Sequence, residues 1–328
     1  MSHFSVCVAI PGIRLIGKEI GRCEIEEILD DILAPYDEGT EDRRYMAFDD
    51  RTGEAGERYE NGSTAAVRFP DGTVRSQYDS VFTERFKVSG GKILEKTGGD
   101  AAETEDSLSL ELIADCPLKK LYTFEEYCRV HCSYSEHQGR WGYWYNPDAR
   151  WDWYAVGGRY SGAFLADREL RQCLETGDGE DRDFKFKHAD GARKGDIAWA
   201  EKRRRAAEAG AAEYDLLRRC FETGDVRELG TLAAVTEDGI RGWCETLYRK
   251  GESLNEYLLR SGIGPNDRFV LNCYSFVDQY GEWHSMGDMG WFGISANEKG
   301  QREWHSEVQD FLTALDDDDF LVMVDCHI

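Results

Sequence analysis

Apolar strand patterns at both ends of the chain constrain its fold more than any other feature of the sequence. Residues 3–10 alternate with period two, and residues 320–328 form a second apolar strand. A helix is expected after the first strand, because apolar residues between 25 and 33 recur at helical spacing and Pro35 ends the pattern. Another helical pattern, over 301–319, directly precedes the last strand. The two ends therefore predict one sheet with helices packed on it.

The order of these elements predicts an α+β fold with a mostly antiparallel, ferredoxin-like sheet that helices cover on one face. Two strand patterns, over 267–279 and 281–295, meet at a Gln-Tyr-Gly-Glu turn and predict a hairpin. The sheet domain is expected to comprise residues 1–168 and 262–328.

Two segments interrupt this expected sheet domain. Residues 169–261 have little strand signal and predict an inserted helical subdomain, in which 197–225 and 236–262 both read as helices. Thr236 is the expected cap of the second helix. Residues 38–115 are Gly-rich, charged and weakly periodic, which predicts an irregular, charged excursion.

Composition narrows the class of protein. The formal net charge of −24 repels nucleic-acid phosphates, so direct binding of DNA or RNA is not expected. The charge is typical of a soluble acidic protein, or of an acidic surface that imitates a phosphate backbone. Ten scattered cysteines without a signal-peptide pattern predict reduced thiols and a cytoplasmic location, and no apolar run predicts a membrane span.

The two terminal strands carry the first candidate site. Asp325 and His327 share one face of the last strand, and His3 would lie beside them if the first and last strands are antiparallel neighbours. Two imidazoles and a carboxylate suit a transition metal or an acid/base pair, so these three residues are the candidate catalytic residues and the candidate metal ligands. The alternative is that they are solvated, or that Asp325 and His327 satisfy each other at a sheet edge.

The stretch 150–162, RWDWYAVGGRYSG, carries the second candidate site. Its candidate ligand-binding residues are Trp151, Asp152, Trp153, Tyr154, Gly157, Gly158 and Arg159. As a strand, it would place the tryptophans on one face and Asp152 and Tyr154 on the other, before a glycine hairpin turn or bulge. The aromatic faces could stack a planar ligand while Arg159 binds a phosphate or carboxylate. The alternative is a core of indoles in which Asp152 accepts a hydrogen bond from an indole or from Arg159.

Further candidates lie in two other stretches of the sequence. His284, Asp288 and Trp291 lie in a Gly-rich strand pattern that would allow close approach of a ligand to the backbone. Residues 128–132, CRVHC, offer thiol and imidazole ligands but lack a second ligand pair at zinc-site spacing, so a packed helix is favoured. No phosphate-binding loop, dinucleotide fingerprint, zinc-protease motif or nucleophile elbow is present, and no cofactor is assigned.

Several stretches together resemble an uncharacterised family of proteins from bacteriophage, prophage and bacterial genomes. They are MSHFSVCVAI, ILAPYDE, GYWYNPDARWDWYAVGGRYSG, ARKGDIAWA, MGDMGWFGI and the closing VDCHI. The chain departs from that pattern at Tyr160, where tryptophan is usual, and in an enlarged helical insertion. The family has no established activity, and the resemblance implies a phage accessory protein.

Two hypotheses of different classes follow. The first is an accessory protein that binds a host or defence component through protein contact, acidic mimicry or sequestration of a small nucleotide. The second is a metal-dependent or acid/base enzyme that acts on a nucleotide-like small molecule. The expected partners are accordingly a host protein or a nucleotide-like ligand, with no membrane, and an oligomer is compatible with either hypothesis.

Overall fold

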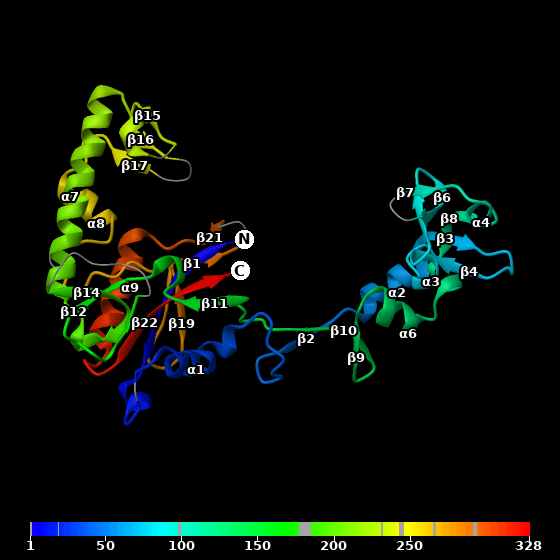
Figure 1. Cartoon of the computed structure of the whole chain (residues 1–328), viewed down its shortest axis with the longest axis horizontal. Helices are drawn as coiled ribbons and strands as arrows, with labels where there is room; N and C mark the ends of the chain where they lie inside the picture. Colours follow the sequence, from blue (N-terminus) through cyan, green and yellow to red (C-terminus); the bar gives the residue numbers. More distant parts are fainter. Residues whose placement is uncertain are drawn as a thin grey trace. The chain divides into compact units, whose positions relative to one another are not determined.

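The first and last strands of the chain are antiparallel neighbours in the computed structural model, as the sequence predicted. β1 (His3–Ile10) pairs with β22 (Phe320–His327), with His3 opposite His327. The chain ends lie side by side (Figure 1), and the backbone N–H of Ser2 donates to the carbonyl of Ile328 at 3.2 Å. The structure describes residues 2–18, 20–97, 100–176, 185–230, 232–242, 246–264, 267–290 and 294–328.

The main sheet is mostly antiparallel, and β1 and β22 lie at its centre. Its order is β12 (Phe164–Asp167), β14 (Phe186–Arg193), β22, β1, β18 (Ser275–Val277) and β19 (Trp283–Ser285). The predicted hairpin is confirmed as β18 and β19. The strand order differs from the ferredoxin-like expectation, because β1 is parallel to β18 and directly beside it, whereas a split βαβ unit places another strand between them.

Helices cover both faces of this sheet, so the expectation of a single covered face was wrong. On one face, Phe4, Val6 and Val8 pack with residues of α1 (Arg22–Leu33). On the other, Leu321 and Met323 pack with the apolar side of α9 (Gln301–Ala314). The physical reason is that β1 and β22 carry apolar side chains on both faces, such as Val8 and Ala9 on β1, and these must be removed from water.

Two strands pair with β22 on the side opposite β1. β14 pairs with its beginning, from Phe320 to Val322, and β11 (Trp153–Val156) pairs with its end, from Val324 to His327. Between them the chain turns through the 3₁₀ turn η4 (Gly158–Tyr160) and continues into β12. The strand after the glycines pairs with β14 and not with β11, so the glycine turn does not close the predicted hairpin.

The segment 169–261 contains more strand than its composition indicated. α7 (Trp199–Thr223) confirms the first predicted helix, whereas β13 (Cys173–Glu175) and β14 belong to the main sheet. The second predicted helix is instead a small sheet followed by a short helix: β15 (Ala234–Thr236), β16 (Gly239–Arg241), β17 (Thr246–Arg249) and α8 (Leu254–Arg260). The turn requires glycine at 239, where a Cβ would lie 1.9 Å from the carbonyl oxygen of Tyr248, and Ser253 caps α8.

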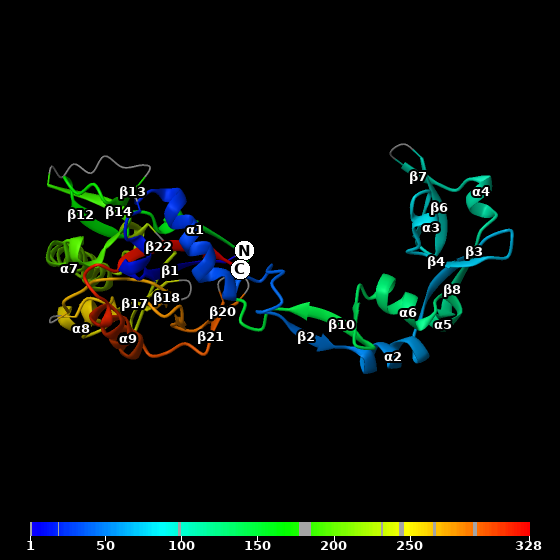
Figure 2. The ribbon, with the colours of Figure 1, turned by 90° about the horizontal axis from the view of Figure 1, so that it is seen from below.

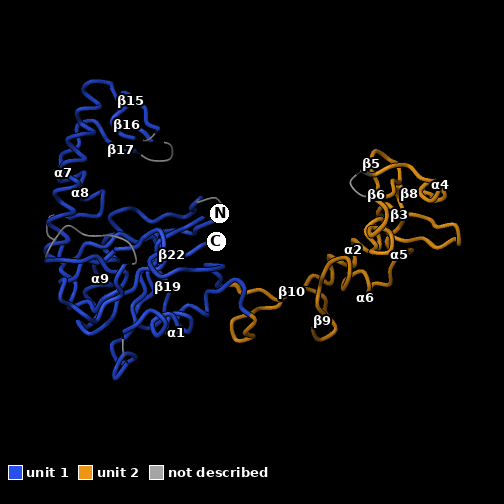
Figure 3. The backbone as a smooth tube through the Cα atoms, viewed as in Figure 1, with its two compact units in different colours: residues 1–40, 148–328 blue, residues 41–147 orange. Residues whose placement is uncertain are grey.

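The chain forms two compact units, residues 1–40 with 148–328 and residues 41–147 (Figure 3). The second unit contains most of the stretch that was expected to be irregular. It holds the short sheets β2–β10–β9, β4–β3–β8 and β5–β6–β7. Their weak periodicity follows from the shortness of the strands and the turns between them.

The strands of the second unit are β2 (Ala47–Asp50), β3 (Ser63–Arg68), β4 (Val74–Ser76), β5 (Phe86–Ser89), β6 (Lys92–Thr97), β7 (Asp100–Ala102), β8 (Glu111–Pro117), β9 (Ser135–His137) and β10 (Arg140–Tyr145). Its helices are α2 (Thr52–Asn61), α3 (Ser80–Thr83), α4 (Glu105–Leu108), α5 (Leu118–Leu121) and α6 (Phe124–Glu126), which a π-turn (Tyr127–His131) extends. That turn buries Cys128 and stacks His131 on Tyr127, as expected for a packed helix.

The remaining elements belong to the first unit, which Figure 2 shows from below. They are η1 (Gly12–Leu15), η2 (Ala34–Tyr36), η5 (Lys194–Asp196), η6 (Arg227–Leu229), β20 (Asp288–Met289) and β21 (Ser295–Ala296). Within the part of the chain that the structure describes, no helix is both long and apolar enough to span a bilayer.

Candidate functional site

Two histidine–aspartate pairs meet at the ends of β1, β22 and β11. Nδ1 of His3 donates to Oδ1 of Asp325 at 3.0 Å, and Nδ1 of His327 donates to Oδ1 of Asp152 at 2.6 Å. The two imidazole centroids are 5.1 Å apart, with the rings inclined at 72°. We call these four residues and Trp153 the dyad site. The structure thus brings together the three residues that the terminal strands predicted and adds a carboxylate from the tryptophan stretch.

Trp153 covers the histidine pair. Its ring stacks on that of His327, with centroids 5.2 Å apart and planes at 16°, and it meets His3 edge to face at 5.3 Å. The register explains the contact, because Trp153 lies opposite His327 in the β11–β22 ladder. The residue is 44% exposed, so it also presents surface to solvent.

The two tryptophans of the motif have different roles, which the alternation pattern did not predict. Trp151 is buried in the core beside α1 and donates from Nε1 to the carbonyl of Leu33 at 3.3 Å. Trp153 and Asp152 both contact His327, although they were expected on opposite faces. The reason is that β11 begins only at Trp153, and Asp152 lies in a bend before the strand.

Asp325 connects the dyad site to the glycine turn. Its Oδ2 accepts from the backbone N–H of Arg159 at 3.0 Å, while Oδ1 accepts from His3. Gly158 has φ +51°, and a Cβ there would lie 2.5 Å from Cβ of Asp325. The second glycine is therefore needed because the turn packs directly against this carboxylate.

A second buried carboxylate holds the other side of the turn, and sequence analysis missed it. Asp190 on β14 accepts from the hydroxyl of Ser161 and the backbone N–H of Gly162, both at 2.8 Å, and from Arg22 at 3.1 Å. A Cβ at Gly157 would lie 2.5 Å from its carboxyl carbon. A carboxylate flanked by small residues in the strand HADGAR was the signal available in the sequence.

Asp325 and His327 form the buried interior of the dyad site. Asp325 is 2% exposed and His327 5% exposed. Nε2 of His327 is buried and has no hydrogen-bond partner among the residues that the structure describes. Tyr160 lies against the site and donates from its hydroxyl to the carbonyl of His3 at 3.2 Å. Burial, and then the charge of Asp325, raise the pKa of Tyr160.

The other predicted site residues lie elsewhere or outside the described residues. Tyr154 packs against the core and donates to Asp30, and burial followed by this hydrogen bond raises its pKa. His284 stacks on Phe276, with centroids 4.6 Å apart. Asp288 accepts from Asn297 at 2.8 Å. Trp291 lies outside the described residues.

The sequence predicted His3, Asp325 and His327 as metal ligands, but their donor atoms are not grouped as three ligands of one ion. Among the described residues, one group of three donor atoms lies within 4.8 Å, formed by Asp278, Glu282 and His284 on the β18–β19 hairpin. Within the described part of the chain, His3, Asp325 and His327 do not form such a group; Nδ1 of His3 faces Asp325, whereas Nδ1 of His327 faces Asp152.

Comparison of the chain with models of known protein families, with curated proteins and with solved structures finds no match. A proposal for its function therefore has to come from the geometry of its own residues.

Proposed function

We propose that this chain is an acid–base enzyme that acts on a nucleotide-like small molecule at the dyad site. The observation that carries the proposal is Nε2 of His327, a buried ring nitrogen without a hydrogen-bond partner among the described residues. Leaving a buried polar atom unpaired costs roughly 1–3 kcal/mol. A site that retains such an atom is suited to pairing it with a bound ligand.

The proton chemistry follows from the two hydrogen bonds. A carboxylate can only accept, so Asp152 requires the proton of neutral His327 on Nδ1, and Nε2 then carries the lone pair of a general base. A proton taken up at Nε2 gives an imidazolium that the 2.6 Å contact with Asp152 stabilises. His3 is held in the same way by Asp325 and supplies a second imidazole for proton return. Asp152 and Asp325 act as positioning residues.

The surface of the site supports a planar, anionic ligand. Trp153 is stacked on His327 on one side and is 44% exposed, so its free surface can stack a planar ring such as a nucleobase. Arg159 is exposed, and its guanidinium has no hydrogen bond or ion pair among the described residues. Its backbone N–H is fixed by Asp325, which places this cation beside the dyads.

The test is turnover of nucleotides by the purified full chain. Nucleoside mono-, di- and triphosphates and dinucleotides are incubated with the protein, and products are followed by liquid chromatography and mass spectrometry. We expect conversion of at least one of them, and a loss in kcat of about a hundredfold or more for His327→Asn, the typical contribution of a general base. The asparagine amide can still donate to Asp152, so the fold is retained.

Two further variants separate the role of Trp153 in ligand binding from the role of His327 in proton transfer. Trp153→Ala should raise KM much more than it lowers kcat, because stacking binds ground state and transition state alike. His284→Asn is the matched control. His284 also faces a carboxylate, that of Asp278 at 3.4 Å, but this pair lies on the β18–β19 hairpin and not at the dyad site. A chain that converts and binds none of these nucleotides, or a His327→Asn variant as active as the parent, would overturn the proposal.

Binding of a host or defence component, as by a phage accessory protein, stays a second prediction. The formal charge of −24 favours a basic partner. The two predictions are compatible, because a chain that converts a nucleotide can also act within a host cell.

A further inference from the structure

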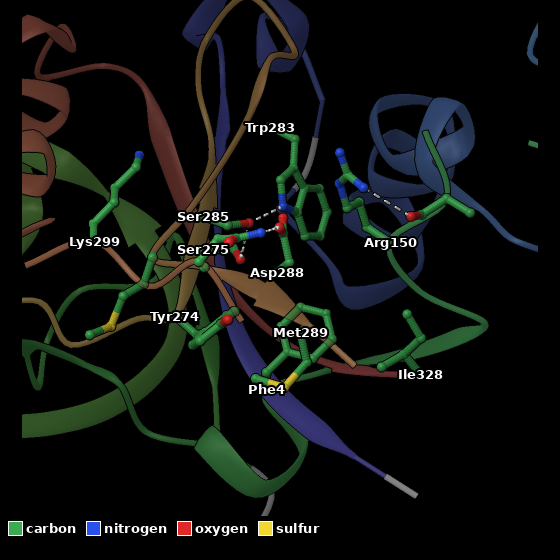
Figure 4. A pocket seen from close by; sticks show the side chains of 14 residues that line it. Phe4, Arg150, Tyr274, Ser275, Trp283, Ser285, Asp288, Met289, Lys299 and Ile328 are labelled. Atoms are coloured by element: carbon green, nitrogen blue, oxygen red, sulfur yellow. Dashed lines mark hydrogen bonds between the residues drawn. The ribbon is translucent and has the colours of Figure 1, made fainter. Parts of the chain in front are cut away.

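A pocket of about 340 Å³ lies in the first unit and is separate from the dyad site (Figure 4). Phe4 and Ile328 line it, whereas their neighbours His3 and His327 belong to the dyad site. Successive residues of a strand point to opposite faces, so the pocket and the dyads lie on opposite faces of the same two strand ends. The volume is in the range of small-molecule sites.

The wall of the pocket is aromatic and apolar. Phe4 meets Tyr274 at 5.8 Å and Trp283 at 6.4 Å between ring centroids, both at steep angles. Met289 and Ile328 extend this surface. An apolar or aromatic body of a ligand would therefore be removed from water here.

A pair of serines adds a hydrogen-bond donor to the wall. Nε1 of Trp283 donates to Oγ of Ser285 at 2.7 Å, and Ser285 shares one hydrogen bond with Oγ of Ser275 at 2.9 Å. The two hydroxyls carry two protons, and their contact uses one of them. Among the described residues no acceptor takes the other proton, although Ser275 is fully buried. When Ser275 donates in the shared hydrogen bond, the second proton lies on the half-buried Ser285 and is available to a ligand acceptor.

One cation and one anion border the same pocket. Arg150 donates to the carbonyl of Ala149 at 3.3 Å and has no carboxylate partner among the described residues. Asp288 accepts one hydrogen bond, from the uncharged amide of Asn297. Arg150, Asp288 and Trp283 all line this pocket (Figure 4). Lys299 also lines the pocket, but it is already paired with Glu307 at 2.6 Å.

We propose that this pocket binds a free amino acid with an aromatic or large apolar side chain. Arg150 would pair with its carboxylate, Asp288 with its ammonium group, and the aromatic wall with its side chain. A zwitterion matches one unpaired cation and one unpaired anion, whereas a ligand with a single charge leaves one of them without a partner. This site is independent of the nucleotide chemistry proposed for the dyads.

The test is calorimetric titration of the full chain with three probes that differ in one charge. They are L-phenylalanine, L-phenylalaninamide, which lacks the carboxylate, and 3-phenylpropanoate, which lacks the ammonium group. We expect L-phenylalanine to bind at least about tenfold more tightly than either of the others, the effect of one charged hydrogen bond. Arg150→Gln should abolish the preference over the amide, and Asp288→Asn the preference over 3-phenylpropanoate.

The matched control is Arg171→Gln, which removes an exposed arginine outside the pocket and should leave all three affinities unchanged. Failure of L-phenylalanine to bind at millimolar concentration would overturn the proposal. So would equal affinity for all three probes, or loss of binding in the control. Competition between L-phenylalanine and a nucleotide bound at the dyads would contradict the assignment of two separate sites.

Discussion

Replacement of Gly158 by alanine is expected to lower the free energy of unfolding of the first unit by about 2–5 kcal/mol and to disrupt the dyad site. Gly158 has φ +51°, which an alanine adopts only at a cost of about 1–2 kcal/mol. The new Cβ would also lie 2.5 Å from Cβ of Asp325, and relieving such overpacking costs about 1–3 kcal/mol more. Asp325 would have to move, and it is the carboxylate that orients His3.

The matched control for this variant is Gly224→Ala. Gly224 has φ +73°, but a Cβ at this position would meet no atom within 4 Å, so the variant carries the backbone cost alone. Differential scanning calorimetry of both variants would measure the difference. If the two lose equal stability, the glycine turn is not packed against Asp325 as described.

The second large effect is expected for Asp325→Ala. It would leave Nδ1 of His3 and the backbone N–H of Arg159 without their shared acceptor, the buried carboxylate. Leaving a buried donor without its partner typically costs about 1–3 kcal/mol, and two donors lose their acceptor here. Asp325→Asn should cost less, because the amide oxygen can satisfy one of the two donors, although its NH₂ group faces the other.

Denaturant unfolding of the two Asp325 variants tests this order of stabilities. Asp31→Asn is the surface comparison, because Asp31 pairs with Arg14 while its side chain is 73% exposed, and such pairs contribute about 1 kcal/mol or less. An Asp325→Ala variant as stable as Asp31→Asn would show that the buried carboxylate does not organise this end of the sheet.

The faces of the terminal strands could be predicted from simple periodicity, whereas their pairing was inferred from the ferredoxin-like arrangement. Period two fixed which residues share a face, and the adjacency of the first and last strands then placed His3 opposite His327. The cover on both faces was not predicted, although β1 buries side chains on both of its faces.

The rest of the site depends on contacts that no local pattern encodes. Asp152 reaches His327 only because β11 starts later than the alternation predicted, at Trp153. Gly157 and Gly158 are explained by Asp190 and Asp325, which are distant in sequence and enter through β14 and β22. The sequence predicted a helix where the short sheet after α7 lies, because local propensity favours one there. The sheet forms instead because tertiary pairing and the turn at Gly239 outweigh local propensity.

The protonation of His327 tests the proposed acid–base chemistry most directly. In a protein labelled with ¹⁵N at histidine, a ¹⁵N–¹H correlation spectrum through two bonds reports which ring nitrogen of neutral His327 carries the proton. We predict the proton on Nδ1, toward Asp152, and a Nε2 resonance that shifts when a nucleotide substrate binds. A proton on Nε2 in the free protein, or a Nε2 resonance that no bound nucleotide displaces, would contradict this prediction.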